Sequence, residues 1–204
     1  MARYDLLRAV AYLATCITKW TEQCNEDLYR LICYINSTAA LTQVSWIGDE
    51  LKDLKLRLYV DADFAGCERT QRSTTGVVLF LSGKNSRFML GATSKRQTAV
   101  SNSTAEAEMI AGAFAIRSEG IPAMELMDTL GQNLYADDSY HISLEIEEDN
   151  EAMQKLLDSG TYSQKLRHAS RTHRTNLAFV IERYKEDDYI YVKRCKTVDQ
   201  AADI

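Results

Sequence analysis

Carboxylates stand at four points of the sequence where a fold could gather them: Asp61, Glu108, Asp149 and Asp203. Asp61 and Asp149 each follow a run with strand periodicity. Glu108 lies in the first turns of a predicted helix, and Asp203 lies in the last predicted helix. Taken singly, each acid is more simply explained as a solvated or helix-capping residue. The chemistry therefore depends on whether the fold brings them together.

Clustered carboxylates repel one another, and a hard divalent cation is their natural compensation. Mg²⁺ takes oxygen ligands and keeps several waters and substrate phosphate oxygens in its shell. Two such ions about 4 Å apart activate an attacking water and stabilise the leaving oxygen of a phosphodiester. The four acids therefore indicate hydrolysis with two Mg²⁺ ions, for which Mn²⁺ can substitute.

The hydrophobic pattern predicts the elements that must position these acids. Leu56, Leu58 and Val60 alternate with polar residues, so residues 56–61 predict a strand that ends at Asp61. The elements predicted after it are, in chain order, a hairpin of strands 75–81 and 87–94, a helix capped by Ser103 or Thr104, a helix over 122–130, a strand over 141–146, a helix over 150–157, a helix over 170–183, a strand over 189–194 and a last helix from Val198.

The order βββαβαβα predicts an α/β fold. Its mixed five-stranded sheet has three antiparallel strands first, then parallel strands added by helical crossovers, with helices flanking it. The acids of the first and fourth strands meet if these strands are neighbours, and a helix packed across that edge delivers a third acid. Before this domain, residues 5–16 and 22–37 predict two amphipathic helices, the second capped by Thr21. We expect a helical extension over residues 1–50 and the α/β domain over 51–204.

Composition is typical of a folded protein rather than a disordered one, with 46% hydrophobic and 26% charged residues among 204. The five cysteines are scattered and odd in number, which favours neither a disulfide framework nor a zinc site and suggests an intracellular, reducing compartment. No signal peptide or membrane-spanning segment is predicted. The net charge of −5 still permits a local basic strip beside an acidic site.

Four sequence words occur in order along the chain: YVDADFAG (59–66), RSTTG (72–76), SKRQTAVSNSTAEAE (94–108) and VDQAADI (198–204). Together they resemble the motifs of the RNase H domain of Ty1/copia-type LTR retrotransposon polyproteins. Residues 1 to about 38, with YDLLRAVAYLA and LYRLICYI, resemble the end of the reverse transcriptase and connection region that precedes RNase H there. The resemblance implies an RNase H-like fold and cleavage of the RNA strand of RNA–DNA hybrids. It also implies the reverse transcriptase of a parent polyprotein as partner, in the cytoplasm or a retrotransposon particle.

Carried over by motif, the resemblance makes Asp61 the first metal ligand, Glu108 the helix glutamate, Asp149 (in EDNEAM) the third ligand and Asp203 (in QAADI) the fourth. Glu106 is the alternative to Glu108, which is preferred because the E-M-I-A that follows matches the helix core pattern. Asp63 is interpreted as a supporting or turn residue.

The chain departs from the family pattern in three places. Phe64 stands where a tryptophan is usual, and RFMLGATS lacks the tryptophan usual in the third strand. We expect these two changes to alter packing only. The family's last helix continues past the ADI word, so we expect a fraying end to hold Asp203 weakly here.

Basic and polar segments supply candidate nucleic-acid contacts. The segment LRHASRTHRTN (166–176) resembles a family word of H-x-x-R-x-H type. Its Arg171 and Arg174 are candidate phosphate ligands. Either His168 or His173 could assist proton transfer or product release, and His173 is taken as the candidate catalytic residue. A solvated helix start is an equal alternative. Further contacts to phosphate or 2′-hydroxyl groups are expected from Arg72, Ser73, Thr74, Lys95, Arg96, Gln97, Ser101, Asn102 and Ser103, unless these only shape turns.

Three functions remain open. The first is an active endoribonuclease specific for RNA–DNA hybrids. The second is a catalytically weak or inert nucleic-acid-binding or scaffold module derived from a retrotransposon. A transposase or integrase core shares the metal chemistry, but its glutamate comes late in the chain, whereas here an aspartate comes last.

Overall fold

The computed structural model of the chain describes residues 3–67, 69–150, 155, 157, 172, 173 and 176–203. The chain divides into two compact units, Met1–Val44 and Ser45–Ile204. None of the helices within the described ranges is long and apolar enough to cross a membrane.

The first unit is a pair of helices, as the amphipathic pattern predicted. Helix α1 spans Leu7–Cys16 and helix α2 spans Glu22–Ser37, with short 3₁₀ turns at Tyr4–Leu6 and Ile17–Lys19. The predicted cap is confirmed, because the Thr21 hydroxyl accepts a hydrogen bond from the Cys24 amide at 3.4 Å. A small core of Leu13, Cys16 and Cys24 joins the two helices.

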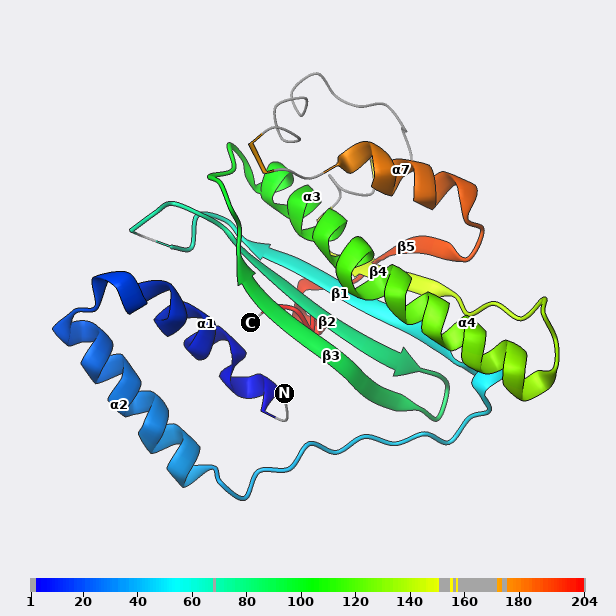
Figure 1. The fold of residues 1–204 in the computed structure, drawn as a ribbon, viewed down its shortest axis with the longest axis horizontal. Coiled ribbons are helices and arrows are strands. Elements are labelled where there is room, and N and C mark those ends of the chain that lie inside the picture. The colour runs from blue at the N-terminus through cyan, green and yellow to red at the C-terminus, as the bar shows by residue number, and fades with distance from the viewer. Residues whose placement is uncertain are drawn as a thin grey trace. The chain divides into compact units, whose positions relative to one another are not determined.

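The second unit contains the predicted mixed five-stranded sheet (Figure 1). Its strands are β1 (Lys55–Asp63), β2 (Thr74–Ser82), β3 (Arg87–Arg96), β4 (Leu144–Glu148) and β5 (Ile190–Arg194), in the order β3-β2-β1-β4-β5. Strands β1, β2 and β3 pair antiparallel, while β4 pairs parallel with β1 and β5 parallel with β4. The sequence-based fold class is therefore confirmed.

Strand alternation gives the sheet two faces of different character. On the inner face, Leu56, Leu58 and Val60 are fully buried beneath α3 (Thr104–Ala115), α4 (Ile121–Tyr135) and α7 (Leu177–Glu186). On the outer face, a smaller cluster forms around Tyr59, Val78, Phe80 and Ala202. Asp61 shares the alternation of Tyr59, so it belongs to the outer face at the end of β1.

Helices α3 and α4 form one continuous helix across the sheet, with α7 beside α3 (Figure 1). A π-helical turn at Ile116–Gly120 joins them. Pro122 lacks a backbone N–H, and a wider turn just before it accommodates the missing bond without ending the helix. The sequence predicted a separate helix over 122–130; the structure extends it in both directions.

The predicted start of the fourth strand was wrong, because a side chain takes over a backbone group there. Strand β4 begins at Leu144 rather than His141. The Ile142 amide donates a hydrogen bond to the Asp128 carboxylate at 2.7 Å, and His141 Nδ1 lies 3.0 Å from the same carboxylate. Helix α7 spans Leu177–Glu186 and is capped by Asn176, and the start predicted at residue 170 lies outside the described residues. Of the helix expected over 150–157, only Lys155 and Leu157 lie within the described residues after Asn150, and both are helical.

The terminal segment also differs from expectation. Instead of a helix from Val198, a single 3₁₀ turn at Thr197–Asp199 is followed by a further turn. Gln200 leaves the helical region, with φ −71° and ψ 103°. Its side chain donates a hydrogen bond to the Val60 carbonyl on β1.

Candidate active site

Two neighbouring parallel strands bring the first and third predicted acids to one edge of the sheet. Strands β1 and β4 pair in register as far as Tyr59 and Glu147. Asp61 lies two residues beyond the first of these, and Asp149 two residues beyond the second. The adjacency that the sequence required of the first and fourth strands is thus confirmed.

The charges that act on Asp61 identify which acids are its neighbours. Burial, followed by the charges of Asp203 and Asp149, raises the pKa of Asp61 to about 6. Asp203 has the largest effect of the neighbouring charges, although it lies 142 positions away in the sequence. The C-terminal segment therefore delivers its aspartate to the end of β1.

Helix α3 contributes Glu108 from the inner side. Only 4% of this residue is exposed. Burial, followed by the charges of Glu148, Asp61 and Asp149, raises the pKa of Glu108 to about 9. The structure thus brings together all four predicted acids. It adds a fifth, Glu148, which the sequence pattern did not indicate. We call these five residues, Asp61, Glu108, Glu148, Asp149 and Asp203, the acid cluster.

Glu148 could have been found from strand alternation. Leu144, Ile146 and Glu148 share the inner face of β4, so a carboxylate at the third position must point into the core. Glu148 is 2% exposed, and burial raises its pKa to about 8. One of its oxygens accepts a hydrogen bond from the Asn150 amide at 3.1 Å.

The donor set of the acid cluster fits a hard divalent cation. One buried oxygen of Glu108 and one of Glu148, Oε2 in each, have no hydrogen-bond partner among the described residues. Buried carboxylates normally have a hydrogen-bond or metal partner. Within the described residues, no group of three or more His, Cys, Asp or Glu side chains could hold a metal ion. Mg²⁺, however, is usually held by only one or two carboxylates together with waters and substrate phosphates. One or two carboxylates of the acid cluster, together with waters and substrate phosphates, would be the kind of ligand set that Mg²⁺ takes.

Glu106 has a different role from Glu108, its neighbour on α3. Its Oε2 accepts hydrogen bonds from the Asn102 amide at 2.8 Å and from Asn102 Nδ2 at 3.2 Å. Its Oε1 lies 3.4 Å from Nε2 of His173, whose side chain is fully buried. The structure therefore pairs the candidate catalytic histidine with Glu106. His168, Arg171 and Arg174 lie outside the described residues.

Three predicted nucleic-acid contacts are internal. Gln97 donates hydrogen bonds to Thr75 Oγ1 at 3.2 Å and to the Ala107 carbonyl at 2.9 Å, and it accepts one from Ser101 at 3.0 Å. Ser73 is fully buried and accepts from the Ala65 amide at 3.2 Å. The expectation that Ser73, Gln97 and Ser101 bind nucleic acid is corrected. Gln97 and Ser101 tie β2 to the start of α3, and Ser73 holds the loop after β1. The candidates that keep exposed surface are Arg72, Thr74, Lys95, Arg96, Asn102 and Ser103.

The strand register places part of this surface at the same end of the sheet as Asp61. Arg96 on β3 pairs with Thr74 on β2, and Thr74 pairs with Asp63 on β1. This row lies two residues beyond the Asp61–Gly76 pair. Basic and hydroxyl groups thus flank the acid cluster on the side of β2 and β3. Ser103 is the N-cap of α3, because its hydroxyl accepts a hydrogen bond from the Glu106 amide at 3.2 Å.

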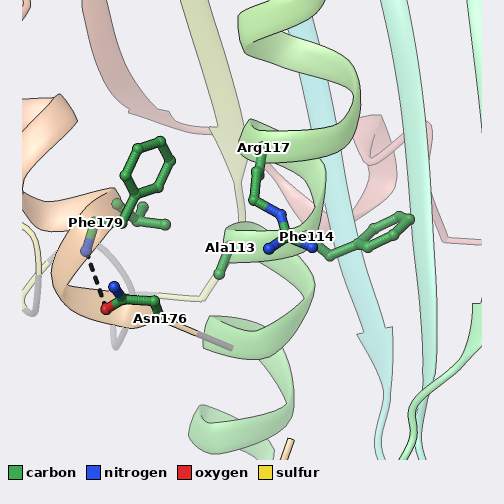
Figure 2. Close-up of a pocket in the computed structure, with 6 residues that line it drawn as sticks. Ala113, Phe114, Arg117, Asn176 and Phe179 are labelled. Atoms are coloured by element: carbon green, nitrogen blue, oxygen red, sulfur yellow. Dashed lines mark hydrogen bonds between the residues drawn. The ribbon is translucent and has the colours of Figure 1, made fainter. Parts of the chain in front are cut away.

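A separate small hollow lies between α3 and α7 (Figure 2). It has a volume of about 270 Å³, and its walls are Ala113, Phe114, Arg117, Asn176, Phe179 and Val180. Asn176 is used as the α7 cap, because its Oδ1 accepts from the Ala178 and Phe179 amides at 3.1 and 3.4 Å. Its walls include no member of the acid cluster, so this hollow is distinct from it.

Comparison of the sequence with models of protein families and with curated proteins finds no match. The acid cluster and the sequence words that surround it are therefore what indicate a function.

Proposed function

We propose that this chain is a metal-dependent endoribonuclease that hydrolyses the RNA strand of RNA–DNA hybrids. The observation that carries the proposal is the convergence of acids from β1, α3, β4 and the C-terminal segment, with two buried carboxylate oxygens that lack a partner among the described residues. The family resemblance of the surrounding sequence words gives the reaction and the substrate.

In this proposal, Asp61, Glu108, Asp149 and Asp203 hold two Mg²⁺ ions. When bound, the ions supply Lewis-acid activation of water and stabilisation of the leaving oxygen. The protein's contribution is to hold mutually repelling carboxylates at one place. Burial and repulsion make ionisation of these carboxylates unfavourable, which is why the pKa values of Asp61 and Glu108 are raised. Cation binding offsets that cost.

Substrate selection would depend on shape and on the 2′-hydroxyl. Exposed Lys95 and half-buried Arg72 and Arg96 are suited to phosphate contacts, while Thr74 and Asn102 can bond hydroxyl groups. With few cationic contacts, binding by the acidic chain should be modest and should weaken as salt rises.

The test is cleavage of a labelled RNA–DNA hybrid by the full chain and by Asp149→Asn, with Mg²⁺, with Mn²⁺ and with EDTA. Single-stranded RNA and duplex DNA serve as substrate controls. Cleavage of the hybrid's RNA strand only by the wild type, and only with metal, supports the proposal. A folded wild-type chain that leaves the hybrid intact with Mn²⁺ at high enzyme concentration overturns it in favour of a binding or scaffold module.

A further inference from the structure

Gln200 connects the backbones that carry two members of the acid cluster. Its Nε2 donates a hydrogen bond to the Val60 carbonyl at 2.9 Å, across 140 residues of sequence. Its Oε1 accepts from the Ala202 amide at 3.3 Å. Val60 directly precedes Asp61, and Ala202 directly precedes Asp203. One amide side chain, only 7% exposed, thus bridges the two residues that come just before these acids.

Close packing holds the same segment from a second side. Ala202 is 1% exposed and packs with Tyr59, Val78 and Phe80 on the outer face. Gly76 on β2, which pairs with Asp61, is in close contact with Ala202. A Cβ at Gly76 would be 2.3 Å from the Ala202 carbonyl oxygen. A glycine is required at this position because of the close approach of the backbone.

These contacts replace the helix that the sequence predicted as the support of Asp203. Only short turns precede it, and the Asp203 amide bonds to the Gln200 carbonyl at a long 3.4 Å. Such turns define the direction of a side chain poorly by themselves. The Gln200 amide and the Gly76–Ala202 contact supply the missing restraint, and both act at the end of β1 where Asp61 lies.

We infer that Gln200 is a positioning residue that holds Asp203 beside Asp61, and that Gly76 provides the space in which it does so. The inference rests on the proposed function, because the purpose of this arrangement is to present both carboxylates to one cation-binding site. Gln200 itself is not assigned a contact with metal or substrate.

A double-mutant cycle on Mn²⁺ binding tests the inference. Calorimetry would measure Mn²⁺ affinity of the full-length wild type, Gln200→Leu, Asp203→Asn and the double variant. Leucine keeps much of the buried volume but removes both hydrogen bonds. We expect each single change to weaken Mn²⁺ binding about 10-fold or more, within the range known for residues that orient metal ligands. We expect the double variant to be no weaker than Asp203→Asn, since Gln200 acts only through Asp203. A purely structural role would give additive losses.

A second variant reaches the same segment without touching Gln200. Gly76→Ala must displace the Ala202 carbonyl, whereas Gly91→Ala on β3 is a matched control, because a Cβ there meets only Glu119 Oε2 at 3.9 Å. Gly76→Ala is expected to weaken Mn²⁺ binding and to speed hydrogen exchange of the Ala202 amide. Gly91→Ala is expected to change neither.

The outcomes separate the inference from the proposed function. If the wild type binds no Mn²⁺, the proposed metal site fails and the positioning role falls with it. If Asp203→Asn weakens Mn²⁺ binding while folded Gln200→Leu and Gly76→Ala bind like the wild type, only the positioning role is overturned. Additive losses in the double variant overturn it as well.

Discussion

Glu108 on α3 and Glu148 on β4 form the most deeply buried pair of the acid cluster, and Glu148 is the strongest neighbouring charge acting on Glu108. Each keeps one carboxylate oxygen without a hydrogen-bond partner among the described residues. Two such groups cannot both ionise cheaply in a medium of low dielectric constant. The pair should therefore control how the stability of the metal-free protein depends on pH.

Metal-free protein should become less stable as the pH rises from about 5 to 9. The pKa values of Glu148 and Glu108 are about 8 and about 9 in the folded chain, against about 4.3 in an unfolded one. The folded state therefore holds protons that the unfolded state releases, so this contribution to stability is complete below about pH 4 and is lost as the pH rises through 8 and 9. Urea unfolding in EDTA at pH 6, 7.5 and 9 measures the effect. A free energy of unfolding that stays level or increases over this range would contradict it.

Replacing Glu148 with glutamine should stabilise the metal-free protein at pH 8. Glutamine keeps the size of the side chain and an acceptor for the Asn150 amide, but it removes the cost of burying an ionisable carboxylate beside Glu108. We expect an increase of about 1–3 kcal/mol in the free energy of unfolding and a weaker dependence on pH. Added Mn²⁺ should stabilise this variant less than it stabilises the wild type. Loss of stability at pH 8 without metal would count against the assignment.

Glu145→Gln should have the opposite effect, which makes it a matched control on the same strand. Glu145 is 2% exposed on the outer face, where its carboxylate contacts Lys55 and lies 2.9 Å from Arg57 Nε and 3.4 Å from Lys193 Nζ. Burial opposes ionisation, but hydrogen bonds with Glu147, Lys55 and Tyr191 outweigh it and lower the pKa of Glu145 to about 2.

Removing that charge takes away the carboxylate that Lys55, Arg57 and Lys193 share, although Arg57 and Lys193 still contact Glu147. We expect a loss of about 1–3 kcal/mol at pH 7. Because the pKa is depressed, the wild-type contribution is present above about pH 4.3 and is lost as the pH falls towards 2. Chemical denaturation of both glutamine variants in one buffer series provides the comparison. Equal stability of Glu145→Gln and wild type at pH 7 would show that the ion pairs contribute nothing.

The features that could be predicted from the sequence are those that depend on the local alternation of polar and apolar residues. Asp61 lies near the end of β1, which continues to Asp63, and Asp149 directly follows β4. Both places needed only the period of a strand. The buried bonds of Gln97 and Ser73 were not predictable, because a polar loop and a polar network under a helix have the same composition. The turn before Asp203 was also missed, since the bond that replaces the expected helix joins Gln200 to Val60, 140 residues away. Tertiary contacts of this kind override local propensity.

The two glutamates in the first turns of α3 provide the sharpest test of the site. Glu108→Gln removes a member of the acid cluster, whereas Glu106→Gln alters a side chain bound to Asn102 and His173. Loss of residues that merely orient metal ligands costs 10–100-fold. We therefore expect Glu108→Gln to lower hybrid cleavage by about 100-fold or more, and Glu106→Gln to lower it by less than about 10-fold.

The two variants should also differ in stability. Glu106→Gln weakens a buried contact with His173 and the bonds to Asn102, so its free energy of unfolding should fall by about 1–2 kcal/mol. Glu108→Gln removes a buried carboxylate with a raised pKa, so at pH 8 without metal it should be at least as stable as the wild type. Cleavage rates and urea unfolding, measured on the same preparations, keep loss of chemistry separate from loss of fold. If Glu106→Gln abolishes cleavage while Glu108→Gln retains it, the roles of the two glutamates are reversed, and the acid cluster as defined here is not the site of hydrolysis.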